Sequence, residues 1–143
     1  MAAIDAARVS IILNALLPVG TGGNPGTTMA ALTASPMKVR LNSSLSTPSA
    51  AGTELTGSGY SAGGLAVGGQ STASSAGSNV TVPAVSALSW TNASGGAWSI
   101  ASLDITDSTG VRTFFGPLTG QPVSVANGNT FQIAVAGITV SLT

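Results

Sequence analysis

The chain has 143 residues, enough for one domain with a buried core. Its four basic and four acidic side chains make up 6% of the residues, whereas soluble proteins average about 25%. Histidine and cysteine are absent, which removes the commonest general base, the commonest metal ligand and all thiol chemistry. Four basic residues also offer no footprint for nucleic acid.

The low charge predicts self-association. A free monomer with so few charged side chains is poorly protected against aggregation. We therefore expect other subunits to cover most of its surface, and we predict a homo-oligomer, with a trimer as the first choice. We expect no cofactor, no metal and no enzymatic activity.

Residues 4–17 predict a helix that is apolar nearly all round, which is typical of a buried helix. We expect Leu13 and Leu16 to lie at a subunit contact. The segment is shorter than the ~20 apolar residues that cross a bilayer, so we expect no membrane partner. A secretory signal would begin with basic residues, but here Asp5 precedes Arg8.

Residues 37–42 predict a half-buried strand, because apolar and polar side chains alternate along it. Lys38 and Arg40 share its polar face. One interpretation is that both side chains are simply solvated, since exposed charges contribute little. The alternative is a small cationic patch that faces a carboxylate of a neighbouring subunit.

Residues 52–60 predict a fixed turn. The stretch contains the only glutamate of the chain, Glu54, the only tyrosine, Tyr60, and three glycines, which reach backbone angles that other residues resist. A buried glutamate without a partner costs several kcal/mol, on the order of 3–5. We therefore predict that Glu54 pairs with Lys38, Arg40 or a backbone amide and that the Tyr60 hydroxyl is hydrogen-bonded over the same turn. The alternative is a solvated turn.

Residues 61–79 consist mainly of glycine, serine and alanine, with Leu65 and Val67 as larger apolar side chains. Such a stretch is either a flexible linker or an arm that becomes ordered against another subunit. We predict an extended arm that lies on a neighbouring subunit.

Residues 80–143 predict a series of strands separated by tight turns. Trp98 and Ile100 share one face, whereas Leu103 and Ile105 have the opposite parity, which predicts a β-bulge near residues 101–102. The sequence Asn127-Gly128 is the strongest hairpin signal in the chain.

These patterns together predict a mainly β fold, an antiparallel, jelly-roll-like β-sandwich with one short N-terminal helix. We expect a single domain over residues 1–143. Its parts are the helix (4–17), the strand and turn region (18–60), the arm (61–79) and the β-strands (80–143).

Carboxylates are the remaining candidates for chemistry. Asp104 and Asp107 match the paired acids of a glycosidase in type, but three residues apart at a strand end they fit turn-capping aspartates as well. With Glu54 they offer oxygen ligands for calcium, although no EF-hand-like spacing is present. We expect neither a catalytic nor a metal site here.

Several short stretches carry a resemblance to a known family. Residues 46–60 resemble the signature of small tailed-bacteriophage virion proteins, described as tail fibre-like or minor structural proteins. The C-terminal half is similar as well, in residues 95–107, 115–118, 127–131 and 138–142. In that family a short helix commonly precedes the strand that leads into the signature. The resemblance covers most of the chain except residues 61–79.

One position departs from the family pattern. Family members usually carry an arginine two residues after the tyrosine, and Ala62 stands there in this chain. If that arginine pairs with the glutamate, another cation must do so here, and Lys38 or Arg40 is the obvious substitute.

The resemblance implies a virion structural protein that is assembled in the host bacterial cytoplasm. One expected role is a capsid decoration or cement protein, with itself and the major capsid subunits as partners. The other is a minor tail or tail-fibre protein, with tail subunits as partners. A third hypothesis is a carbohydrate-binding module in which Trp90, Trp98 and Tyr60 stack on sugars.

Overall fold

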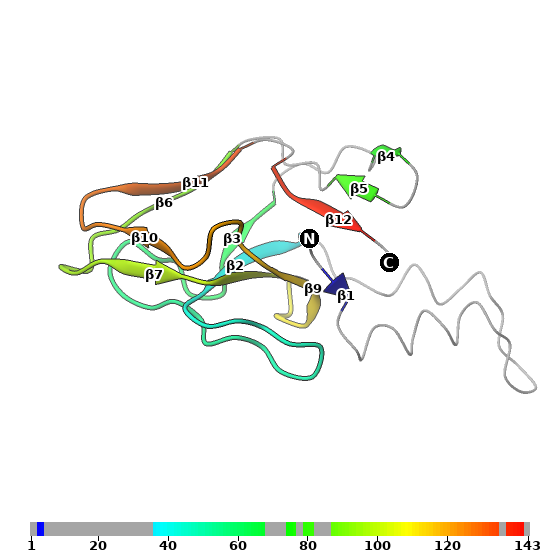
Figure 1. The fold of residues 1–143 in the computed structure, drawn as a ribbon, viewed down its shortest axis with the longest axis horizontal. Helices are drawn as coiled ribbons and strands as arrows, with labels where there is room; N and C mark the ends of the chain where they lie inside the picture. The colour runs from blue at the N-terminus through cyan, green and yellow to red at the C-terminus, as the bar shows by residue number, and fades with distance from the viewer. Residues whose placement is uncertain are drawn as a thin grey trace, which may run out of the picture.

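The computed structural model describes residues 3–4, 36–67, 74–76, 79–81, 87–134 and 137–141, with side chains for 36–67, 87–134 and 137–138. These residues form twelve short strands and no helix, and every strand pairing is antiparallel (Figure 1). The predicted mainly β, antiparallel fold is therefore confirmed. The predicted helix lies outside the described residues, except that Ile4 belongs to a strand.

The largest sheet has five strands in the order β1-β9-β8-β2-β3. Its strands are β1 (Ala3–Ile4), β9 (Arg112–Pro117), β8 (Ser102–Thr106), β2 (Lys38–Asn42) and β3 (Leu65–Ala66). The predicted strand at 37–42 is confirmed, because Val39 and Leu41 of β2 are both fully buried. They pack in the core with Leu103 and Ile105 of β8. The other face of β2 and β8 carries polar side chains.

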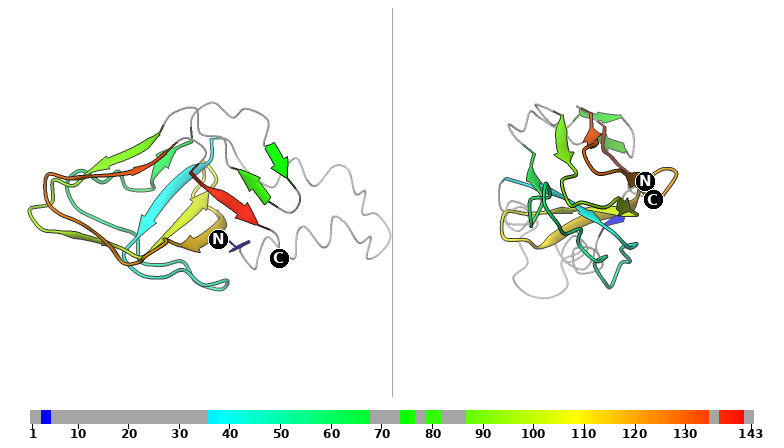
Figure 2. Two further views of the ribbon diagram at one scale, coloured as in Figure 1. Left: turned by 45° about the horizontal axis from the view of Figure 1, so that its top comes forward. Right: turned by 90° about the vertical axis from the view of Figure 1, so that its left-hand side faces the viewer.

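Two smaller sheets contain two strands each (Figures 1 and 2). One pairs β6 (Leu88–Thr91) with β11 (Thr130–Ile133), and the other pairs β7 (Trp98–Ile100) with β10 (Val123–Val125). Alternate side chains on these strands enter the same core as those of the large sheet. Trp98 is 3% exposed, as its position on the apolar face predicted.

The turn at Asn127-Gly128 is present, but the predicted hairpin is wrong. The Asn129 amide donates to the carbonyl of Ala126 (3.0 Å), and Gly128 has a φ of 86°. The strands that flank this turn do not pair with each other, because β10 pairs with β7 and β11 pairs with β6. The Asn-Gly signal specifies the turn locally, whereas the buried faces of the strands determine their partners.

The change of parity near residue 101 is also present, but its cause differs from the predicted bulge. The chain passes at Ala101 from β7, which pairs with β10, into β8, which pairs with β2 and β9. The Ala101 amide donates to the Asn42 carbonyl (2.8 Å). The register shift in this region lies further on, between Ile105 and Thr106. One continuous segment thus serves two sheets and turns a different face inward in each.

Part of the predicted arm belongs to the chain's own sheet. β3 pairs with β2, and Val67 is 1% exposed with its amide bonded to the Met37 carbonyl (2.8 Å). Glycine makes this packing possible: a Cβ on Gly64, whose φ is 83°, would collide with the carbonyl oxygen of Val39. Residues 65–67 are therefore held by the chain's own sheet, and their packing on a neighbouring subunit stays a prediction.

The remaining strands form a three-stranded sheet in the order β12-β5-β4. They are β12 (Thr139–Ser141), β5 (Asn79–Thr81) and β4 (Ser74–Ala76). β4 lies within the predicted arm and also pairs inside the chain, with β5. Residues 68–73 and 77–78 of the arm lie outside the described part.

Candidate functional site

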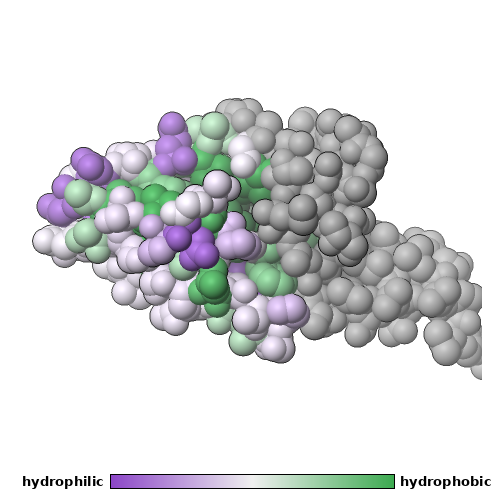
Figure 3. Space-filling view, in the orientation of Figure 1, coloured by the Kyte–Doolittle hydropathy of each residue, from purple (hydrophilic) through white to green (hydrophobic). Residues whose placement is uncertain are grey.

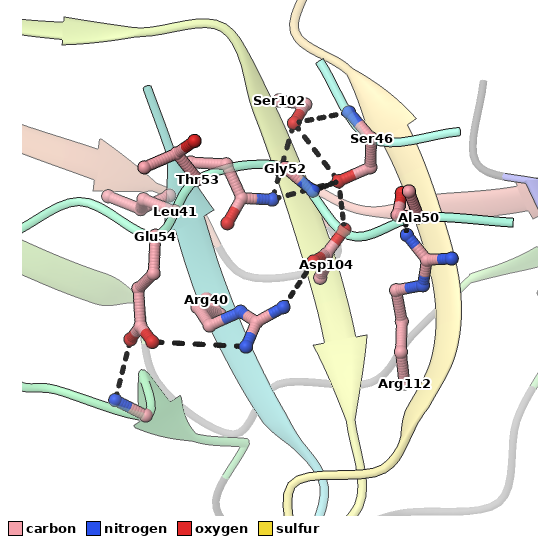
Figure 4. A network of polar contacts seen from close by, with 12 residues as sticks. Arg40, Leu41, Ser46, Ala50, Gly52, Thr53, Glu54, Ser102, Asp104 and Arg112 are labelled. Atoms are coloured by element: carbon pink, nitrogen blue, oxygen red, sulfur yellow. Dashed lines mark hydrogen bonds and ion pairs between the residues drawn. The ribbon is translucent and has the colours of Figure 1, made fainter. Parts of the chain in front are cut away.

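A cluster of polar side chains lies on the outer face of β2 and β8, beneath the loop formed by residues 43–53 (Figure 4). We call it the Arg40 network. Its members come from β2, β8, the loop and the predicted turn, and they are Arg40, Asn42, Ser46, Glu54, Tyr60, Ser102 and Asp104.

The ion pair between Arg40 and Asp104 is the centre of the network. The two residues stand opposite each other in the β2–β8 register. Arg40 Nη2 donates to Asp104 Oδ2 at 2.6 Å, and Asp104 is fully buried. The hydroxyl of Ser46 donates to the other carboxylate oxygen at 2.6 Å. A buried carboxylate requires such partners, since a buried charge without them is strongly destabilising.

Glu54 has the kinds of partner that the sequence predicted. Its Oε1 accepts hydrogen bonds from the Gly63 amide (2.6 Å) and the Tyr60 hydroxyl (3.0 Å). Its Oε2 lies 3.8 Å from Nη1 of Arg40, so Arg40 rather than Lys38 forms the ion pair. This pair is partly exposed and longer than that to Asp104, so we expect the two hydrogen bonds to hold Glu54 more firmly.

Tyr60 joins the turn to β2. Its hydroxyl accepts a hydrogen bond from the Leu41 amide (3.2 Å) while donating to Glu54, and its ring packs edge-on against Trp98 at 6.3 Å. Burial raises the pKa of Tyr60 well above its ordinary value, and the nearby Glu54 carboxylate raises it further. Tyr60 therefore keeps its proton, and its bond to Glu54, into strongly alkaline solution.

Serine hydroxyls bind the loop to the sheet, and no sequence pattern distinguishes these serines from the many others. Ser102 donates to the carbonyl of Ser44 (2.8 Å). Ser46 accepts bonds from the Gly52 amide (2.8 Å) and from the side-chain amide of Asn42 (3.0 Å). Asn42 and Ser102 lie on the outer, polar face of their strands and are nevertheless fully buried. Their burial could not be predicted from the sequence, because it depends on the loop that covers this face.

Arg112 holds the tip of the same loop and was also missed in the sequence. Its guanidinium donates to the carbonyls of Ala50 (2.8 Å) and Thr47 (2.8 Å) and lies 4.8 Å from the ring centre of Phe115. These contacts connect the loop tip to β9. Arg112 therefore restrains the loop directly, whereas Arg40 bonds to Asp104 and Glu54 beside it.

The two aspartates considered for chemistry have separate structural roles. Asp107 caps a turn: its Oδ1 accepts from the amides of Thr109 and Val111, both at 2.9 Å, and Asp104 belongs to the Arg40 network. Among the residues with described side chains, no group of three or more acidic residues is arranged to hold a metal ion. The turn-cap interpretation of Asp107 is confirmed.

The tryptophans do not form a sugar-stacking platform. Trp90 and Trp98 are 2% and 3% exposed, and Tyr60 is half-buried with its hydroxyl bonded. Stacking on a sugar requires an exposed aromatic face, which neither tryptophan offers. Leu13 and Leu16, the predicted contact residues, lie outside the described part of the chain.

Comparisons of the chain with protein-family models, curated proteins and solved structures found no match. Within the described residues, no helix has the length and apolar character needed to span a membrane. The hydrogen bonds of the Arg40 network fix the loop on the sheet. Its charged groups are bonded to each other and to the backbone.

Proposed function

We propose that the chain is a non-enzymatic structural component of a tailed-phage particle that works as a repeated, self-associating subunit. The observation that carries this proposal is how the protein uses its few charges. Five of the eight charged side chains make contacts within the chain, namely Arg40, Glu54, Asp104, Asp107 and Arg112.

Charges used in this way restrain loops and turns and leave the surface poor in charge. Two long stretches, residues 55–103 and 113–143, contain no charged side chain at all. Such a surface suits burial against other subunits better than life as a free monomer, since charge keeps monomers apart. The resemblance of residues 46–60 to a virion signature supports the same role, because this stretch includes the turn and most of the loop that the network fixes.

Within this role we propose a capsid decoration or cement protein that bridges neighbouring capsid subunits. A fixed loop on a stable sheet provides a rigid docking element, and rigidity reduces the entropy lost on binding. Its partners are further copies of itself, as a trimer, and the major capsid subunits. The finer architecture belongs to this proposal: a jelly-roll-like sandwich, supported by the turns at 92–96 and 126–129, which connect strands of different sheets.

The copy number per purified particle tests the proposal. A decoration protein is expected in hundreds of copies, in a fixed ratio to the major capsid protein, with averaged density on the capsid surface. Quantitative mass spectrometry of purified particles gives the ratio. Absence of the chain from purified particles would overturn the virion role altogether.

A minor tail or tail-fibre protein is the second candidate. It rests on the same resemblance and the same charge-poor surface, and it predicts a few copies per particle with density at the tail. A carbohydrate-binding module is the weakest candidate because both tryptophans are buried. Specific binding on a glycan array would revive it.

A further inference from the structure

The two edge strands of the β6–β11 sheet differ in what lies against their outer edges. The predicted turn covers the outer edge of β6 at its C-terminal end: the Ala93 amide donates to the Ser58 carbonyl (3.0 Å), and Gly59 lies against the Thr91 carbonyl. β11 pairs with β6 on one side, and among the described residues no strand pairs with its other side. The outer edge of β11 is therefore open within the described part of the chain.

The hydrogen-bond pattern identifies the main-chain groups at this edge. The Asn92 amide donates to the Asn129 carbonyl (2.9 Å), one step before the β6–β11 ladder begins. Inward and outward groups alternate along an antiparallel strand. Phe131 and Ile133 thus bond inward to β6, and the amides and carbonyls of Thr130 and Gln132 face outward.

Charge and proline, two of the means by which natural proteins protect exposed strand edges, are both absent from β11. Arg112 is the last charged residue of the chain, so neither β11 nor neighbouring β10 carries a charge. Phe131 and Val123 are half-buried hydrophobic residues on these two strands. On the side of the molecule where β10 and β11 lie, Figure 3 shows hydrophobic residues next to hydrophilic ones.

We propose that β11 pairs antiparallel with β11 of a second copy of this chain across a two-fold axis. Thr130 of one copy then lies opposite the partner's Gln132, and the two pairs exchange four main-chain hydrogen bonds. A second copy fits because its edge is equally uncharged, so the contact buries no like charges and leaves no charge unpaired. The inference rests on self-association as in the proposed function but does not require the virion role. The two-fold contact is separate from the contacts within the trimer and would join copies of two trimers.

Gln132→Pro tests the contact, because proline removes one outward amide and leaves the ladder to β6 intact. Gln132→Thr is the matched control, since it keeps the amide and suits a strand. Sedimentation velocity over a hundredfold range of concentration is the measurement. We expect the wild type and Gln132→Thr to gain mass together, and Gln132→Pro to need at least tenfold higher concentration for the same gain.

Equal self-association of all three proteins, or a wild type that stays monomeric over the whole range, would overturn the proposal. Amide hydrogen exchange of the wild type provides a second test that needs no variant. The amides of Thr130 and Gln132 should exchange at least tenfold more slowly at high concentration, and the inward amide of Phe131 should not change. Concentration-independent exchange at both outward amides would also reject the contact, while loss of the chain from particles would leave it intact.

Discussion

Arg40 makes two ion pairs of different strength, and the difference follows from burial. Asp104 is fully buried, at 2.6 Å from Arg40, and Glu54 is partly exposed, at 3.8 Å. Breaking a buried pair costs about 3–5 kcal/mol, whereas an exposed pair contributes about 0.2–1 kcal/mol. The two carboxylates that share one guanidinium should therefore be energetically unequal.

Double-mutant cycles test this inequality. Arg40→Gln combined with Asp104→Asn should show a coupling of at least about 1.5 kcal/mol in the free energy of unfolding, measured by urea denaturation. Arg40→Gln combined with Glu54→Gln should show about 0.5 kcal/mol or less, because the Gly63 and Tyr60 bonds survive in part. Equal couplings would contradict the assignment of Asp104 as the principal partner.

Tyr60 makes the stability depend on pH in alkaline solution. The folded pKa of Tyr60 is raised, so the unfolded chain loses this proton first, near pH 10. The stabilisation is complete below about pH 10 and is lost as the pH rises toward the folded pKa. Because Tyr60 is the only tyrosine, absorbance at the tyrosinate band should rise together with unfolding. Tyr60→Phe should weaken this pH dependence, and a tyrosinate signal that precedes unfolding would contradict it.

The turn at 52–60 depends, as an element, on close approach to β6. A Cβ on Gly59 would collide with the Thr91 carbonyl oxygen, and the φ of Gly59 is 90°. We expect Gly59→Ala to lower the free energy of unfolding by more than about 1 kcal/mol. Gly96→Ala is the matched control, since nothing lies within 4 Å of its Cβ. Thermal unfolding of both variants measures the difference, and equal midpoints would contradict the close approach.

At the scale of elements, the sequence predicts features set by neighbouring residues and misses contacts between residues far apart in the chain. The strand at 37–42, the turn at 52–60 and the cap at Asp107 follow from alternation, glycine and side-chain chemistry. The sequence predicted a cationic partner for Glu54 and left Lys38 and Arg40 as the two candidates, of which Arg40 forms the ion pair. The role of Asp104 was not, because it stands 64 residues from Arg40 and is set by strand register. The Asn127-Gly128 hairpin failed for the same reason.

The whole molecule is expected to function as an assembly. The sequence predicts that residues 4–17 contribute to a subunit contact, so Leu16→Asp should abolish assembly by burying a charge without a partner. Light scattering of the wild type and of Leu16→Asp at equal concentration measures the effect. Leu45→Asp is a useful control, because Leu45 is 51% exposed in the described chain. An unchanged mass for Leu16→Asp would reject this contact.

The turn at 126–129, which joins strands of two different sheets, also determines how the chain must fold. A hairpin there would give an early local nucleus, but β11 finds its partner in β6, where Thr91 and Thr130 are 39 residues apart. β2 pairs with β8 over a longer separation, since Arg40 and Asp104 are 64 residues apart. Such distant pairings slow folding, to about milliseconds to seconds. Refolding followed by tryptophan fluorescence should therefore be slow, and Gly128→Ala, which strains the turn, should speed unfolding far more than it slows folding.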